Sequence, residues 1–153
     1  MPTLHYYTTP IRAREIGMEG LRPQHTFPGT TIPVTFAYPA KAHLAWPSRR
    51  HDENPGLARL FLLSVDSHVE GTEGLTHITF EAQPGTKVFD RATLKYGVEA
   101  YLMSERVLDD TYTSMIKPEA AVIGTIPPEA LTLRPIPADE FTTLLKDYGF
   151  TQG

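Results

Sequence analysis

The chain has 153 residues and 14 prolines, which fits a single domain over residues 1–153 built from many short elements and argues against a helical bundle. The absence of cysteine excludes disulfide frameworks and thiolate metal sites, and a formal net charge of -4 argues against general adhesion to nucleic acid. No apolar run approaches the roughly 20 residues of a membrane span, and the first residues lack the pattern of a secretion signal, so we expect a cytoplasmic protein that does not contact membranes.

The first 21 residues predict a strand, a capped turn, a helix and a stop. Residues 4–7 form an apolar and aromatic run typical of a strand. Thr9 offers a side-chain oxygen to the first unpaired helical amides, and Pro10 occupies a position that needs no N–H donor. Gly20 is suited to end the helix, with Leu21 as the apolar partner of that cap. The N-terminus of this helix is also suited to a phosphate-bearing ligand.

A second strand-to-helix unit is expected next. Residues 22–33 are rich in proline, glycine and threonine and predict a loop, followed by a strand at 34–38. A helical pattern opens at Pro39 and stops at Pro47, ahead of a polar segment. Residues 59–66 are almost continuously apolar, which is typical of a strand buried on both faces. We expect this segment to be the centre of the sheet.

The second half of the chain predicts further short strands. Residues 77–82 alternate polar and apolar side chains, which favours a half-buried strand, and residues 87–90 fit another short one. The stretch 94–107 fits either a helix broken near Gly97 or a pair of strands. Beyond it we expect a polar loop at 109–114, a strand at 120–123, a rigid proline turn at 126–131 and a helical tail at 138–148.

Three segments, taken together and in this order, resemble NAD-dependent ADP-ribosyltransferases of the small bacterial toxin or modifier kind. They are the opening strand and helix through Gly20-Leu21, the strand and helix at 33–44, and the segment 117–131 with its Glu and proline turn. The third segment is similar to that of toxins that modify nucleic-acid bases. The resemblance implies an α+β domain with a split, mostly antiparallel sheet and short flanking helices, and NAD as co-substrate.

The resemblance also implies the site residues. Glu119 corresponds to the catalytic carboxylate, and Tyr38 to the aromatic residue that stacks on nicotinamide. The family has His two places before Thr8, where this chain has Tyr6, while His5 lies one place earlier and should point to the opposite face of the strand. Either residue is therefore a catalytic candidate. Thr8 is expected to contact NAD, the basic residues Lys41, Arg49 and Arg50 are candidates for its pyrophosphate, and Tyr112 and Ser114 for acceptor recognition.

The expected reaction suits a lone carboxylate. Breaking the bond from ribose to nicotinamide creates positive charge on the sugar, which a carboxylate stabilises. Lys117 stands where arginine-modifying members carry Glu or Gln, which disfavours modification of protein arginine. A nucleic-acid base, a protein side chain and a small molecule remain open as acceptors, and the resemblance adds an antitoxin as a further partner. RNA 2'-phosphate transfer and a non-catalytic nucleotide-binding module are the alternatives. The six histidines lack the spacing of a metal site.

Overall fold

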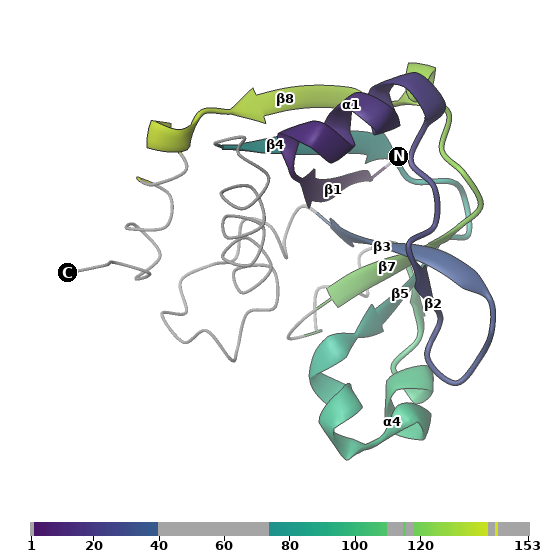
Figure 1. Ribbon diagram of the computed structural model, residues 1–153. Helices are drawn as coiled ribbons and strands as arrows, with labels where there is room; N and C mark the ends of the chain where they lie inside the picture. Colours follow the sequence, from purple (N-terminus) through teal and green to yellow (C-terminus); the bar gives the residue numbers. More distant parts are fainter. Residues whose placement is uncertain (1, 40–73, 110–114, 116–117, 141–142, 144–153) are drawn as a thin grey trace.

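The structure is organised around one antiparallel sheet; helix α1 lies along β4 and β8, and helix α4 lies beside β5 (Figure 1). It is a computed structural model that describes residues 2–39, 74–109, 115, 118–140 and 143. The strands of the described residues are β1 (Thr3–Thr8), β2 (His25–Thr26), β3 (Pro33–Pro39), β4 (Leu75–Glu81), β5 (Lys87–Asp90), β6 (Arg106–Val107), β7 (Pro118–Ile123) and β8 (Thr132–Ile136). The helices are α1 (Pro10–Glu19) and α4 (Val98–Met103), with 3-10 turns η2 (Arg91–Tyr96) and η4 (Pro128–Ala130).

The sheet has two halves that meet at a short junction. Its strand order is β6-β5-β7-β3-β1-β4-β8, and β2 adds to β3. β1 pairs with β4 along its whole length, from Thr3 to Thr8. Among the described residues, β1 pairs with β3 at two positions, Leu4 opposite Pro39 and His5 opposite Tyr38. The two halves diverge beyond this junction (Figure 1). The expectation of an α+β domain with a mostly antiparallel sheet is confirmed.

The core lies on the face of the sheet that α1 covers. Its buried members come from both halves of the sheet, from Leu21 after α1 and from the segment after β6: Leu4, Tyr6, Leu21, Ala37, Ile78, Phe80, Ala82, Val88, Leu108 and Ala120. Helix α1 packs closely against this layer because its facing residues are small. Ala13 is buried, and a Cβ added to Gly17 would stand 3.6 Å from Leu133 Cδ2.

The N-terminal unit forms as predicted. Thr9 caps α1 by accepting a hydrogen bond from the backbone N–H of Arg12 at 3.4 Å, and Pro10 opens the helix. Gly20 ends it with φ +92°, and its N–H donates to the carbonyl of Ile16. Leu21 is fully buried and forms a two-residue bridge with Ile126. This bridge fixes the chain after α1 to the segment that enters β8.

The structure also tests the elements that the sequence predicts after the N-terminal unit. The strands at 34–38, 77–82, 87–90 and 120–123 are present as β3, β4, β5 and β7, and the break at Gly97 separates two helical turns. The loop at 22–33 is partly wrong, because β2 pairs with β3 there. The pattern also missed β8, the last strand at one end of the described sheet, whose Thr132 and Arg134 are exposed and which contains Pro135. Edge positions of this kind carry no clear apolar alternation.

Other predicted elements lie outside the described residues. The prediction that a helix opens at Pro39 is wrong at that residue, because Pro39 ends β3. The rest of that helix, the polar loop that follows and the strand at 59–66 lie among the residues that are not described. Of the tail at 138–148, residues 138–140 and 143 are described, and they are helical. Within the described part of the chain, no helix has the length and apolar character needed to cross a membrane.

Replacing Gly20 with Ala should destabilise the protein by about 2 kcal/mol or more, because a non-glycine residue at positive φ costs about 1–2 kcal/mol and a steric conflict adds to it. The added Cβ would lie 2.4 Å from the carbonyl oxygen of Ile126, in the bridge described above. Gly85→Ala is the matched control, since Gly85 has φ +81° but nothing within 4 Å of an added Cβ. Urea unfolding should show the larger loss for Gly20→Ala; equal losses would contradict this account.

Candidate functional site

A row of polar and aromatic side chains crosses the sheet on the face opposite the core. The register pairs Phe89 of β5 with Glu119 of β7, and His5 of β1 with Tyr38 of β3. Tyr38 lies opposite Glu119, one position beyond the paired residues Ala37 and Ala120. Directly opposed residues share a sheet face. Four neighbouring strands therefore place Phe89, Glu119, Tyr38 and His5 side by side.

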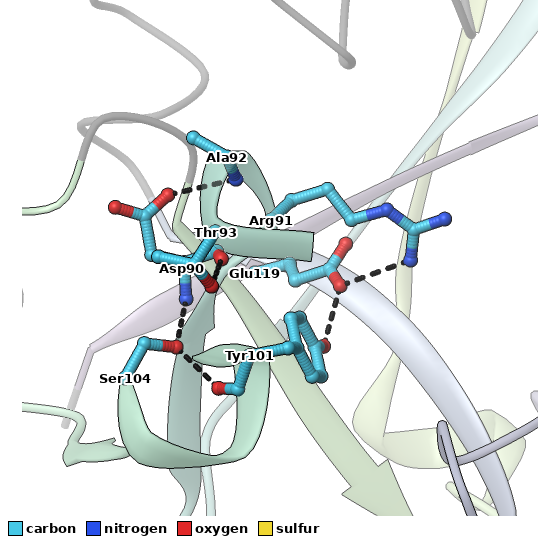
Figure 2. A network of polar contacts seen from close by, with 7 residues as sticks. All are labelled: Asp90, Arg91, Ala92, Thr93, Tyr101, Ser104 and Glu119. Atoms are coloured by element: carbon cyan, nitrogen blue, oxygen red, sulfur yellow. Dashed lines mark hydrogen bonds and ion pairs between the residues drawn. The ribbon is translucent and has the colours of Figure 1, made fainter. Parts of the chain in front are cut away.

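Glu119 is the buried charged residue of this row, with an exposed fraction of 3%. Its Oε1 accepts two hydrogen bonds, from the Tyr101 hydroxyl at 2.6 Å and from Arg91 Nη1 at 3.3 Å (Figure 2). No described residue donates to its other oxygen, Oε2. Within the described residues, the contacts that fix the carboxylate therefore act through one of its two oxygens.

Tyr101 is placed by a cluster of three aromatic rings. Its ring stacks on Phe89 with centroids 5.1 Å apart, and Phe27 lies against both rings. The whole Tyr101 residue is inaccessible to solvent. Because the rings fix its position on α4, the hydroxyl group points to Glu119 at little entropic cost.

A second set of hydrogen bonds joins α4 to the end of β5. Ser104 donates through Oγ to the carbonyl of Tyr101 at 2.6 Å and accepts from the N–H of Asp90 at 2.9 Å. The Asp90 carboxylate then caps η2 by accepting from the N–H of Ala92 (Figure 2). Arg91 is the first residue of η2, so the cap at Asp90 also fixes the backbone position from which the Arg91 side chain extends. Both donors to Glu119 are therefore positioned by the Asp90–Ser104 connection.

Burial controls the acidity of this cluster. Loss of hydration raises the pKa of Glu119, and the bonds from Tyr101 and Arg91 offset only part of that rise. Burial and the neighbouring carboxylate also raise the pKa of Tyr101, which therefore remains a hydroxyl donor at neutral pH. A carboxyl group whose pKa is raised toward neutrality is suited to exchange protons.

The other end of the row contains a pair of histidines. His5 Nδ1 lies 2.8 Å from His77 Nε2, and the two ring planes are 15° apart. The His77 ring also stacks on Tyr7, which the register of β1 and β4 places directly opposite it. Burial lowers the pKa of both histidines, and His5 and Arg134 lower that of His77 further, to about 4. At neutral pH the pair is uncharged.

The alternation along β1 separates the two residues that the sequence left as alternatives. His5 lies on the face of Glu119 and Tyr38, whereas Tyr6 is a buried member of the core. Thr8, two residues further on the face of Tyr6, is also buried. The structure therefore does not bring Tyr6 or Thr8 together with Glu119, because consecutive residues of a strand point to opposite faces. Five other candidates lie outside the described residues: Lys41, Arg49, Arg50, Tyr112 and Ser114.

The sequence reasoning missed Arg91, Tyr101 and His77. Asp90 after a short strand is a signal for a helix cap, which would have placed Arg91 at a defined turn. Nothing in the ambiguous stretch around Tyr101 indicates that its hydroxyl reaches a carboxylate. The contact of His77 with His5 depends on the pairing of β1 with β4, which is a long-range feature. Among the described residues, no group of three or more His, Asp or Glu could hold a metal ion.

Comparison with known proteins adds no assignment to this geometry. A scan against protein-family models gave no match, and a search of curated proteins also found none.

Replacing Tyr101 with Phe should destabilise the protein by about 1–3 kcal/mol, because the ring packing survives while a buried carboxylate loses a hydrogen-bond donor. The pKa of Glu119 should rise further, since the Tyr101 hydroxyl lowers it in the intact protein. Urea unfolding and carboxyl-carbon NMR measure the two effects. Tyr96→Phe, at a residue that is 75% exposed, is the control and should change neither. A Tyr101→Phe variant with unchanged stability and Glu119 pKa would refute the role of this bond.

Stability should fall as the pH drops from about 6.5 to about 4, in a way that depends on His77. The folded pKa of about 4 lies below the ordinary value of 6.5, so between these values the unfolded chain binds more protons than the folded one. Carboxylates titrate in the same window, so the difference between the wild-type protein and His77→Phe isolates the histidine contribution. Melting temperatures measured across this range should decline less steeply in the variant; parallel curves would contradict the prediction.

Proposed function

We propose that this protein transfers ADP-ribose from NAD to an acceptor, with Glu119 as the catalytic carboxylate. The observation that carries the proposal is the buried Glu119, fixed by Tyr101 and Arg91 on the same sheet face as Tyr38 and His5. The two-part antiparallel sheet supports it, since the resemblance of the sequence to ADP-ribosyltransferases implies a split sheet. The sequence-based assignments of Glu119, Tyr38 and His5 were made from three separate segments, and all three side chains share one face.

The geometry suits stabilisation of a sugar cation. In the proposed reaction the bond between ribose C1' and the nicotinamide nitrogen breaks, and nicotinamide leaves with the electron pair. The acceptor forms a new bond to C1' and gives up its proton. Oε2 of Glu119 would face the positive charge that develops on the ribose, or bind its adjacent hydroxyl. The raised pKa also suits Glu119 to take the proton of the acceptor.

Tyr38 and His5 would bind the substrate beside Glu119. The aromatic face of Tyr38 would stack on the nicotinamide ring, since such contacts offer a large area at low entropic cost. His5 lies two strands from Glu119, a separation of about 10 Å at the usual strand spacing. It would therefore contact the ribose hydroxyls or the carboxamide group, while Arg91, half-exposed beside Glu119, is the nearby cation that the described residues provide.

The sequence indicates which chemical classes of acceptor are favoured, and it does not indicate a single molecule. Lys117 in place of an acidic or amide residue disfavours modification of protein arginine, and the resemblance favours a nucleic-acid base, with a small molecule or another protein group as alternatives. A toxin role with an antitoxin partner is part of this proposal. His5 on the Glu119 face weakens the motive for a non-catalytic module, which was the replacement of the family His by Tyr6.

Glu119→Gln should abolish nicotinamide release, with a loss of at least about 100-fold, because a neutral amide cannot stabilise the sugar cation. The substitution preserves size, and its carbonyl oxygen can still accept from Tyr101, so the fold should persist. Chromatography of NAD incubations with separate pools of DNA, RNA and protein measures release and transfer together. Glu129→Gln, in the exposed turn η4, is the matched control and should leave the rate unchanged. Undiminished release by Glu119→Gln would exclude the proposed mechanism.

A further inference from the structure

We propose that His77 is a positioning residue that sets the ring orientation of His5 and determines which of its nitrogens carries the proton. The catalytic effect of this positioning rests on the function proposed above. The contact between the two rings stands independently, on the distance of 2.8 Å from His5 Nδ1 to His77 Nε2 and on the small angle between the ring planes.

The position of His77 is determined by the sheet. It lies opposite Tyr7 on β1 and opposite Arg134 on β8, so neighbours on both sides fix its backbone. The stacking of its ring on Tyr7, at 4.7 Å between centroids and 9° between planes, restricts its rotation. A ring held in this way can in turn orient His5, the neighbour that it contacts through a nitrogen.

The short contact requires one shared proton. Two uncharged imidazoles approach to 2.8 Å only when one nitrogen donates and the other accepts. If His77 Nε2 donates, His5 Nδ1 is the acceptor and His5 Nε2 carries the other proton. If His5 Nδ1 donates, its Nε2 is an acceptor. The contact therefore links the hydrogen-bonding character of His5 Nε2 to the state of His77.

We assign the donor to His77. Of the contacts proposed for His5, we assign the one to the carboxamide oxygen of nicotinamide, which can only accept, so His5 Nε2 must carry a proton to make it. A donor at His77 Nε2 gives His5 this form before substrate arrives. Arg134 on β8 and His5 on β1 both disfavour a positive charge on His77, while Tyr7 and Thr79 are its other neighbours on this sheet face. At metal sites, removing the hydrogen-bond partner that fixes the tautomer of a ligating His commonly changes affinity or activity 10- to 100-fold, and we expect an effect of about that order here.

Two substitutions distinguish the effect of the hydrogen bond between His77 and His5 from the effect of ring packing on Tyr7. His77→Phe retains a ring to stack on Tyr7 but cannot donate to His5. His77→Gln presents an amide N–H near the position of Nε2 and can restore the donor. We expect His77→Phe to raise the KM for NAD by about 10-fold or more with a smaller effect on kcat, and His77→Gln to recover most of the loss. Equal losses in both variants would indicate a structural role and overturn the proposal.

Imidazole nitrogen NMR tests the pair without any substrate. In the wild-type protein His5 should be protonated at Nε2 and unprotonated at Nδ1, and His77→Gln should preserve this state. In His77→Phe, His5 should become a mixture of the two tautomers. An unchanged His5 spectrum in His77→Phe would overturn the proposal even if the kinetics changed. If the wild-type protein releases no nicotinamide, the proposed function fails, and the nitrogen spectra still decide whether His77 controls His5.

Discussion

The hydrogen bond from Tyr101 to Glu119 is the contact on which the candidate site depends. A carboxylate that is 3% exposed has lost most of its hydration, which is costly unless donors replace the water. Tyr101 and Arg91 supply those donors, and the surrounding structure explains how they are available. The rings of Phe89 and Phe27 fix Tyr101, and the capped turn after β5 presents Arg91. The stretch from β5 to α4 thus forms a support for one side chain of β7.

The second constraint is the register at the junction of β1 and β3. With His5 opposite Tyr38, a shift of one residue along β1 would place Tyr6 on the face of Glu119 and send His5 into the core. The observed register buries Leu4 and Tyr6 in the core and places the two histidines on the other face, where Tyr7 is buried against His77. Burial of Leu4 in the core therefore goes together with His5 on the face of Glu119.

The sequence predicts an element well when the residues that determine it are neighbours in the chain. Thr9, Pro10 and Gly20 mark both ends of α1 because caps depend on neighbouring residues. β8 was missed because an edge strand with Pro135 needs no apolar alternation. The same limit applies to the site: Glu119 and Tyr38 were indicated by resemblance, but the roles of Tyr101 and His77 depend on contacts 18 and 72 residues away in the chain. Side-chain partners at such separations follow from the assembled sheet.

Packing on the core face of the sheet determines how the site residues on the opposite face are arranged. In the described part of the chain, two residue pairs join β1 to β3, so packing as well as this pairing holds the two halves together. One core cluster spans both halves, with Leu4 and Ile78 from one and Ala37 and Ala120 from the other. Both alanines are fully buried, and close packing leaves little room for a larger side chain there. The separation between His5 and Glu119 is therefore set by the packing of small residues beneath them, which explains how a narrow junction can maintain a site that extends across it.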